Sequence, residues 1–351
     1  MILVIQELLN QNIEVIIAAD STPLALLKEE FPTLKAIVLK DVEVRYSRKN
    51  QQILKIIGFL PQLAYRIYKE NKDLTQIIAS ENINIVISDN RYGLWNKQIY
   101  SVFVSHQLRL KMPRNFVFLE VFTQKLIQFL TRKFDEIWIP DFENETNFSG
   151  TLSHLKQYNK NKTHFVGILS KFLMSEFQTQ KKQLFESERV LAILSGPEPQ
   201  RTILEELLLN QLNVHKLKAT LVLGKEKDAA QIKHQNIEIV NFANRTKLFE
   251  LISKAEIIVC RAGYSSIMDL AALQKTAILI ATPGQTEQEY LADYLSRKKL
   301  FVKAQQASLN LKTSILELKK LDTTFEIINN NLLIEAIQRM LTRLQKNTKT
   351  N

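Results

Sequence analysis

Short apolar runs alternate with amphipathic segments along the second half of the chain. Residues 190–194 and 257–260 are almost entirely apolar, and each run has the length of a single buried strand. Residues 200–212 and 245–254 lie between such runs and are predicted to be helices. Buried strands that alternate with helices predict a parallel sheet and a protein of the α/β class.

The stretch 256–291 contains this order twice. A buried strand ends in a glycine-bearing turn at 261–263, and a helix starts from Ser265 or Ser266. A second strand ends in a similar turn at 282–284 and is followed by a second helix. Ligands of open α/β sheets bind at the carboxyl ends of the strands. The unpaired N–H groups of two helix N-termini would lie there, which predicts a site for an anion such as a diphosphate.

The first half of the chain is predicted to form a second parallel sheet. Strands at 83–87 and 102–104 are followed by the polar segments 88–93 and 105–108, which should therefore meet at one sheet edge. A Rossmann-like domain should open with a strand and a glycine-rich turn, but this chain opens with an amphipathic helix over 1–11. Either the natural start lies upstream, or the first strand and its loop have been lost.

Composition narrows the class of protein. With 45% apolar and 24% charged residues among 351, the chain resembles soluble globular proteins. Its single cysteine, Cys260, excludes an internal disulfide and fits a reducing, cytoplasmic compartment. Because Cys260 ends a predicted strand, a core position is favoured over a nucleophile. No apolar run reaches the roughly 18 residues of a membrane span, and no signal peptide is evident.

The net charge of +11 favours acidic partners. A phosphorylated ligand or an anionic membrane surface would fit, and a merely solvated basic surface is the alternative; we see no nucleic-acid-binding motif. The basic sequence RLKMPR (109–114) precedes a Phe-rich apolar helix at 116–134. Such a pair can rest on lipid, which would place the protein at the inner face of the cell membrane. The alternative is an ordinary helix buried against the sheet.

Several motifs resemble one known family. The segments CRAG (260–263) and EQEY (287–290), with Ser265, Ser266, Asp269 and Ala292, resemble the MurG-type UDP-N-acetylglucosamine transferases, GT-B glycosyltransferases with a family 28 C-terminal domain. Five segments resemble, more narrowly, a bacterial group of MurG-like transferases: DNRYG (89–93), HQL (106–108), SGPEPQRT (195–202), GYSSIMDLA (263–271) and TPGQTEQEYLA (282–292). The likeness covers most of the chain, is specific over 189–295 and is weaker before residue 83. Within this family, the chain lacks the usual first strand and glycine-rich loop.

The resemblance implies the GT-B fold, in which two Rossmann-like parallel-sheet domains face a cleft. It implies transfer of an N-acetylhexosamine or hexose from a UDP-sugar to an unknown acceptor, such as a lipid-linked one, without a metal or another cofactor. A UDP-sugar 2-epimerase of the same fold and an inactive nucleotide-sugar-binding protein are the alternatives. The expected parts are an acceptor-side domain that is incomplete at its start (1–165), a linker (166–188), a nucleotide-sugar-binding domain (189–325) and a C-terminal helix packing back toward the first domain (326–351).

Four residues around the first glycine turn are candidates for binding the nucleotide. Gly263 would let the backbone turn and approach a ligand closely, and Ser265 and Ser266 would cap the helix or bind a phosphate oxygen. The resemblance implies that Asp269 holds the ribose hydroxyls, because a carboxylate accepts two hydroxyl hydrogen bonds well. The alternative for Asp269 is a first-turn acid favoured by the helix dipole.

The second turn supplies candidates for the sugar. The resemblance implies that Gln288 contacts the donor sugar, and Gln285 lies in the same loop, within reach of the sugar or the diphosphate. Glu289 stands where the family has a second glutamine, which leaves the identity of the sugar open. Thr286 and Glu289 also have the spacing of a capping box, so Glu289 would then close the helix start.

Two arginines and one loop are candidates for the diphosphate. Ser195 and Gly196 would offer backbone N–H groups, and Arg201 would pair with the diphosphate bidentately. A surface arginine on a helix is the alternative for Arg201. Arg261 is the second candidate, with an ion pair to a neighbouring acid as its alternative.

The first half supplies the candidates for the acceptor side. An inverting transfer needs a base for the proton of the acceptor hydroxyl, and His106 or Asp89 would suit that role. For His106, a structural histidine that bonds a loop is the alternative. Three further residues of the same motifs are expected on the acceptor side: Arg91, Tyr92 and Gln107. The sequence has no metal-binding motif.

Overall fold

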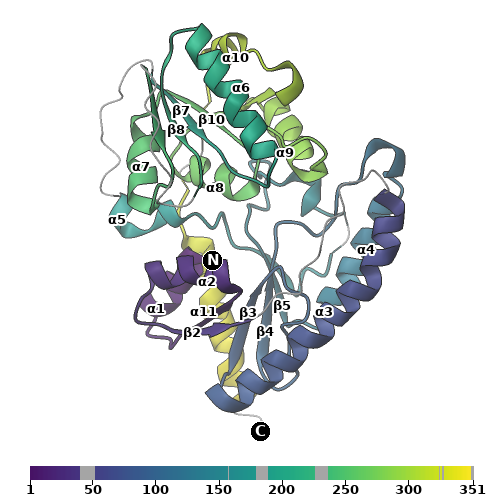
Figure 1. The fold of residues 1–351 in the computed structure, drawn as a ribbon. Coiled ribbons are helices and arrows are strands. Elements are labelled where there is room, and N and C mark those ends of the chain that lie inside the picture. The colour runs from purple at the N-terminus through teal and green to yellow at the C-terminus, as the bar shows by residue number, and fades with distance from the viewer. Residues whose placement is uncertain are drawn as a thin grey trace.

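The chain folds into two lobes that lie one above the other in Figure 1. The computed structural model describes residues 1–39, 52–156, 158–178, 189–225, 236–323, 325 and 328–348. These residues form one six-stranded, one four-stranded and one two-stranded sheet, and all strand pairs are parallel. The predicted α/β class is therefore confirmed.

The six-stranded sheet forms the upper lobe. Its strands are β7 (Arg189–Ile193), β8 (Lys218–Val222), β9 (Ile237–Val240), β10 (Ile257–Cys260), β11 (Ile278–Ile280) and β12 (Val302–Ala304). They lie in the order β9-β8-β7-β10-β11-β12. Counted from β7, this is the order 3-2-1-4-5-6 of doubly wound nucleotide-binding folds, in which the ligand lies beyond the switch point between the first and fourth strands. Here that point lies between β7 and β10.

Helices cover both faces of this sheet: α6 (Gln200–Val214), α7 (Arg245–Lys254), α8 (Tyr264–Ala272), α9 (Thr286–Arg297) and α10 (Leu311–Lys319). Successive side chains of a strand point to opposite faces. Accordingly, Val190 and Ala192 of β7 pack with the apolar residues of α6 and α10, whereas Leu191 packs with those of α7, α8 and α9. The sheet is therefore doubly wound.

The lower lobe contains two separate sheets. The four-stranded sheet is formed by β3 (Ile85–Asp89), β4 (Tyr100–Val104), β5 (Glu136–Ile139) and β6 (Thr163–Phe165), and the two-stranded sheet by β1 (Ile16–Ala19) and β2 (Lys35–Val38). Among the described residues, no strand joins β1 to β3. This gap is the place of the first strand in the 3-2-1-4-5-6 order. The chain instead opens with the predicted helix, α1 (Ile2–Asn10).

The remaining helices belong mainly to this lobe: α2 (Ser21–Glu30), α3 (Gln52–Glu81), α4 (Leu119–Thr131), the short α5 (Ser175–Gln178) and α11 (Asn331–Thr348). The longest of these helices, α3, continues through Pro61. Pro61 is exposed, and because it has no backbone N–H the helix loses one backbone hydrogen bond there. Residues 179–188 of the predicted linker lie outside the described residues. No helix of the described segments is long and apolar enough to span a membrane.

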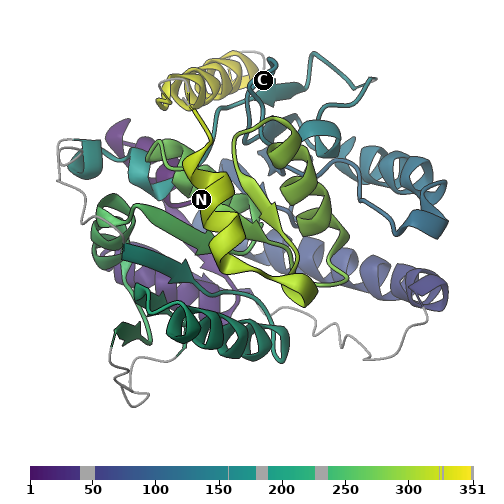
Figure 2. The same ribbon diagram turned by 90° about the horizontal axis from the view of Figure 1, so that it is seen from above.

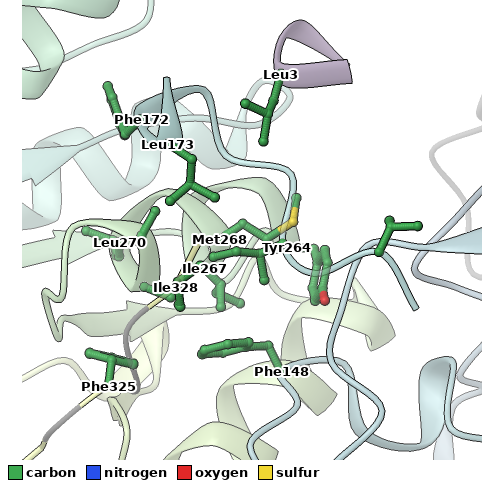
Figure 3. Packing of buried hydrophobic residues seen from close by; sticks show 14 of the residues in the cluster. Leu3, Phe148, Phe172, Leu173, Tyr264, Ile267, Met268, Leu270, Phe325 and Ile328 are labelled. Carbon is green, nitrogen blue, oxygen red and sulfur yellow. The ribbon is translucent and has the colours of Figure 1, made fainter. Parts of the chain in front are cut away.

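One apolar cluster extends through both lobes. It combines Leu3 and Phe148 of the first lobe with Tyr264, Ile267 and Met268 of α8 (Figure 3). The last helix adds buried residues to the same cluster: Leu333, Ala336, Ile337 and Met340. Seen from above, α11 (yellow) lies at the edge of the molecule beside the strands of the first lobe (Figure 2). The lobes therefore share a core, and the site described next lies where they meet.

Candidate functional site

The strands at the switch point of the upper sheet end in polar turns. β7 is followed by Ser195 and Gly196, and the φ of +102° at Gly196 favours glycine. A Cβ atom at Gly196 would lie 3.8 Å from Oγ1 of Thr282, which follows β11. The turns after β7 and β11 therefore approach each other across the end of β10, which lies between these two strands.

Two helices start at this edge. The residues before them, Gly263 before α8 and Gln285 before α9, make no side-chain capping bond. The first-turn N–H groups of a helix have no intrahelical acceptor, so both helix starts offer donors and partial positive charge. A Cβ atom at Gly263 would meet no atom of the described residues within 4 Å. Open space therefore lies directly in front of α8.

The structure corrects part of the prediction for this turn. The φ of Gly263 is −78°, which any residue adopts, so glycine is not needed there to turn the chain. The open space is what distinguishes the position. Ser265 and Ser266 lie in the first turn of α8 and do not cap it, because the helix already starts at Tyr264. Their hydroxyls remain candidates for phosphate contacts.

Arg261 is fully buried behind this edge. Its guanidinium donates to the carbonyls of Ile280 (3.3 Å), Ala281 (3.2 Å) and Gln200 (2.7 Å) and to Oε1 of Gln306 (2.7 Å). No carboxylate of the described residues pairs with it, so the alternative of an ion pair is wrong. Burial lowers the pKa of Arg261 to about 10. A buried cation with only neutral partners leaves positive potential at the ends of β10 and β11, which an anion would offset.

Thr282 is buried at the same place. Its Oγ1 has no hydrogen-bond partner among the described residues. Buried hydroxyl groups are usually satisfied, so an orphaned one beside open backbone donors fits contact with a ligand oxygen. Sequence reasoning did not single out Thr282, although its position directly after a predicted strand was a signal.

The three sugar-side candidates brace the turn before α9. Gln288 accepts a hydrogen bond from the Thr282 N–H (2.9 Å) and donates to Oε1 of Gln285 (2.6 Å). Glu289 accepts from the N–H of Gly284 (2.9 Å). The predicted capping box is wrong, because the Thr286 hydroxyl donates to the carbonyl of Lys111 in the other lobe (2.7 Å). The candidates are thus gathered in one turn, at the end of β11.

Arg201 is occupied by partners within its own lobe. It donates to the carbonyl of Leu223 (3.0 Å) and pairs with Glu198, and its side chain is largely covered. The alternative of a surface arginine is therefore wrong. In this arrangement Arg201 fixes the loop after β7 to the end of β8.

Asp269 faces the segment that connects the lobes. It accepts a hydrogen bond from the Ser170 hydroxyl (2.7 Å), and its other oxygen lies 3.6 Å from Nζ of Lys171. Burial raises the pKa of Asp269, partly offset by Lys171. The alternative of a first-turn acid is wrong, since α8 has no acid in its first turn and Asp269 lies beyond it. The helix dipole therefore does not explain this carboxylate.

His106 is the residue of the first lobe that reaches both helix starts. Its Nε2 lies 2.8 Å from Oε1 of Glu287 in the first turn of α9. Its ring stacks on that of Tyr264, the first residue of α8, with centroids 4.2 Å apart and planes 3° apart. Asp89 is the last residue of β3, the strand beside β4. Burial lowers the pKa of the Met1 amino group, and the nearby carboxylates of Asp89 and Asp269 partly oppose this change.

The contacts that the structure shows for the other acceptor-side candidates lie within the first lobe. Arg91 donates to Glu70 of α3 (2.9 Å). Tyr92 stacks on Phe103 with centroids 5.0 Å apart, and burial raises its pKa to about 12. The backbone N–H of Gln107 donates to the Ser105 hydroxyl (3.1 Å). Arg91 and Tyr92 thus have structural contacts, and His106 remains the acceptor-side candidate at the meeting point of the lobes.

Two cavities lie elsewhere. One of about 490 Å³ is lined by Phe142, Glu145, Thr146, Phe148, Lys298, Leu300, Phe325 and Ile328. The other, of about 370 Å³, lies between β6 and α11 and contacts His164 and Arg339. Neither is lined by a candidate residue for donor or acceptor binding. Among the described residues, no group of three or more His, Cys, Asp or Glu side chains has a metal-binding arrangement.

Comparison with known families identifies the second half. Residues 190–346 match the glycosyltransferase family 28 C-terminal domain. No curated protein matches the sequence significantly. The family match confirms the resemblance predicted from the sequence motifs, and with it the prediction of a glycosyltransferase.

Solved structures extend the likeness to the whole chain. The glycotransferase of kitacinnamycin matches with a TM-score of 0.63 and 12% identity, over 98% of this chain and 91% of that one. SnogD, a glycosyltransferase from Streptomyces nogalater, matches with a TM-score of 0.60 and 13% identity, over 98% and 90%. MurG from Acinetobacter baumannii matches with a TM-score of 0.53 and 14% identity, over 99% and 94%. These likenesses confirm the GT-B fold.

Proposed function

We propose, since residues 190–346 match the C-terminal domain of glycosyltransferase family 28, that the protein transfers a sugar from a nucleotide-sugar, namely a UDP-sugar, to an acceptor hydroxyl. One observation carries the proposal. The switch point between β7 and β10 opens onto free space in front of Gly263 and the start of α8. In doubly wound sheets this is where nucleotides bind, with their phosphates at a helix N-terminus.

Four features support the diphosphate end of the donor at this place. The first-turn N–H groups of α8 and α9 are donors without helical acceptors. The orphaned hydroxyl of Thr282 and the backbone of Gly196 lie beside them. Arg261 adds a buried positive charge behind the edge. In this proposal these groups stabilise the charge that develops on the leaving diphosphate, so the reaction needs no metal.

The neighbouring residues would hold the rest of the donor. Asp269 would accept hydrogen bonds from the ribose hydroxyls, in exchange for its contacts with Ser170 and Lys171. The amide of Gln288, with Gln285 and Glu289 in the same turn, would contact the sugar, an N-acetylhexosamine or hexose. The acceptor would approach from the first lobe, past His106 and Asp89.

Nucleotide binding tests the proposal directly. UDP and UDP-N-acetylglucosamine should raise the melting temperature in a thermal-shift assay, in EDTA as well as without it. Gly263→Ala should weaken UDP binding about tenfold or more, a loss of about 1.4 kcal/mol, because its methyl group would enter the space that the phosphates need. Indifference of the wild type to every nucleotide tested would remove the basis of the proposal.

A matched variant separates binding from stability. Asn244→Ala removes the side-chain cap of α7, which accepts from the Lys247 N–H (2.9 Å), at the edge strand β9. It should cost about 1 kcal/mol of stability and leave UDP affinity unchanged. Incubation with UDP-N-acetylglucosamine in water separates a transferase from a 2-epimerase, since only the epimerase inverts the configuration at C2 of the sugar.

We further propose that α4 rests on an anionic membrane surface, where a lipid-linked acceptor would be found. The helix is unusual because three of its four buried residues, Glu120, Thr123 and Thr131, are polar and only Ile127 is apolar, whereas several apolar side chains in and just before it are exposed. Phe118 is 70% exposed and Phe122 is 51% exposed; Val117, Val121 and Phe129 are also more than half exposed. This distribution argues against the alternative of a helix buried by its apolar face. An exposed apolar stripe with basic neighbours is typical of helices that lie in the membrane interface.

Vesicle sedimentation tests this contact. The wild type should sediment with anionic phosphatidylglycerol vesicles at low salt, and Phe118→Ser with Phe122→Ser should reduce the bound fraction severalfold. Leu316→Ser on α10 is the matched control, because Leu316 is 54% exposed but lies in the other lobe. Equal binding by the double variant and the wild type would rule out α4 as the contact surface.

A further inference from the structure

One hydrogen bond between the lobes joins two residues that both stand at the candidate site. His106 follows β4 of the first lobe, and Glu287 lies in the first turn of α9 in the second. Nε2 of His106 is 2.8 Å from Oε1 of Glu287, and the two side chains are 28% and 32% exposed. The pair is therefore neither deeply buried nor fully solvated, and it borders the open edge of the upper sheet.

The chemistry of the two groups fixes the state of the imidazole ring. A carboxylate can only accept hydrogen bonds, so Nε2 must be the donor. In the neutral ring the proton then sits on Nε2, and Nδ1 keeps its lone pair. Nδ1 makes no hydrogen bond within the described part of the chain. Glu287 thus leaves one ring nitrogen of His106 available as a base.

The orientation of the ring is fixed as well. His106 stacks on Tyr264 in a nearly parallel arrangement, and the Tyr264 hydroxyl donates to the carbonyl of Pro140 (2.8 Å). Tyr264 is buried in the cluster that both lobes share (Figure 3). The plane of the imidazole is therefore set by α8, and its rotation within that plane is set by Glu287 of α9.

From this geometry we infer that Glu287 is a positioning residue, which holds His106 with Nδ1 as the general base for the transfer; the inference rests on the proposed function. The proton of the acceptor hydroxyl passes to Nδ1, and the hydroxyl oxygen forms the new bond to the anomeric carbon. The bond from that carbon to the diphosphate oxygen breaks, and its electron pair leaves with the nucleoside diphosphate. Glu287 stabilises the imidazolium that results.

The pair also makes the base depend on the arrangement of the lobes. Each lobe supplies one member, so movement of the lobes away from each other breaks the bond between Nε2 and Glu287. The imidazole would then lose its fixed tautomer. The base is consequently complete only when the two lobes meet, as they do here.

The competing explanation is that the contact between His106 and Glu287 only holds the two lobes together. A neighbouring residue of α9 provides a control for it. Thr286, the neighbour of Glu287, also bonds across the lobes, to the carbonyl of Lys111 (2.7 Å). Thr286→Val removes one interlobe hydrogen bond from the same helical turn without touching His106. Glu287→Ala removes the carboxylate, whereas Glu287→Gln keeps an accepting oxygen and loses the charge.

Nitrogen-15 NMR of the full chain tests the ring state without any substrate. At about pH 8.5, where a typical imidazole is neutral, the His106 signals should report the Nε2–H tautomer in the wild type, in Thr286→Val and in Glu287→Gln. Glu287→Ala should show a mixture of both tautomers. An Nδ1–H ring in the wild type, or the same tautomer in Glu287→Ala as in the wild type, would overturn the inference.

Turnover provides the second measurement, with UDP-N-acetylglucosamine as donor, water as acceptor and UDP release as readout. Glu287→Ala should lower kcat about 100-fold and leave the donor KM within about threefold, Glu287→Gln should lose less, and Thr286→Val should stay near the wild type. An equal loss of kcat in Glu287→Ala and Thr286→Val would show that the contact between His106 and Glu287 only holds the lobes together. Failure of the wild type to bind UDP would refute the donor proposal instead, while the NMR measurement would still decide the role of Glu287.

Discussion

Gly263 and Gly284 occupy corresponding places, each in a turn between a strand and a helix, but for different reasons. Gly284 has a φ of +80°, in the region that side chains disfavour, whereas Gly263 has a φ of −78°. Neither position would bring a Cβ atom within 4 Å of another described atom. Glycine is thus needed at 284 for the backbone and at 263, on our proposal, for the ligand.

Alanine at these two positions should therefore affect the stability of the fold to different degrees. Gly284→Ala should lower the free energy of unfolding by about 1–2 kcal/mol, the cost of a left-handed conformation for a residue with a Cβ atom. Gly263→Ala should change stability by less than about 1 kcal/mol, since its backbone is already ordinary. Urea denaturation measures both. A larger loss at 263 than at 284 would contradict this assignment.

The sequence located these residues better than it identified their contacts. A glycine or arginine directly after a predicted strand can be assigned to the ligand edge from local pattern alone, as for Gly263 and Arg261. The partners of Arg261, Gln200 and Gln306, come from distant parts of the chain. The bond between His106 and Glu287 spans 181 residues, and only the docking of the two lobes creates it. No periodicity or spacing carries such information.

At the level of elements, α11 is fastened to the first lobe through one carboxylate. Glu136 of β5 is completely buried and accepts from the Tyr100 hydroxyl (3.0 Å), Nε1 of Trp138 (2.7 Å) and the guanidinium of Arg343 on α11 (2.9 Å). A second arginine of α11, Arg339, lies 3.8 Å away. The last helix, which follows the second lobe in sequence, thereby packs against the sheet of the first.

Removal of this charge should loosen the helix. Glu136→Gln leaves two arginines without their carboxylate and should cost about 3 kcal/mol of unfolding free energy. Arg343→Met should cost less, because Glu136 keeps its bonds to Tyr100 and Trp138, and Arg343 is partly exposed. Chemical denaturation of both single variants and the double variant gives the coupling energy. A cost below about 1 kcal/mol for Glu136→Gln would show that α11 is held by apolar packing alone.

Length decided which elements could be predicted. Amphipathic helices and four- or five-residue apolar strands were predicted close to their observed positions, as for β10 and α9. The strands β6 and β12 have three residues each, too few for a periodic pattern; β11 is equally short, but it lies within a longer apolar run that ends at a glycine-bearing turn. The exposed apolar face of α4 was also ambiguous in the sequence, because periodicity shows that a helix has two faces and not which of them is covered.

At the scale of the whole molecule, one face of α9 closes the lobes against each other. Tyr290 accepts bonds from the backbone N–H (2.7 Å) and hydroxyl (3.0 Å) of Thr151, and Tyr294 donates to Oδ1 of Asn147 (2.6 Å). Thr286 and Glu287 continue this face to the candidate site. The same helix thus carries the sugar-side candidates at its start and the contact between the lobes along one face. A change in the packing of the lobes should therefore alter the geometry of the candidate site.

Gly150 of the first lobe faces Tyr290 and Tyr294 of α9 closely, and it allows this coupling to be tested. A Cβ atom there would lie 2.3 Å from the Tyr290 hydroxyl and 2.9 Å from the Tyr294 ring, so in Gly150→Ala these two side chains must shift, and we expect α9 to move away from the first lobe with them. Its φ of +51° adds backbone strain, for which Gly284→Ala is the control, with φ of +80° and no close neighbour. Both variants should lose stability because alanine disfavours a positive φ. The steric contact should cost Gly150→Ala about 1–3 kcal/mol of unfolding free energy more than Gly284→Ala.

The same variant should separate donor binding from turnover. UDP contacts only the second lobe in our proposal, so its affinity for Gly150→Ala should stay within about threefold of the wild type, whereas kcat should fall about tenfold or more as His106 leaves Glu287. Gly284→Ala should instead weaken UDP binding, because its backbone strain lies in the turn before α9 that belongs to the proposed donor site. A Gly150→Ala protein that binds UDP and turns over normally would mean that the contact between α9 and the first lobe is not required for the transfer.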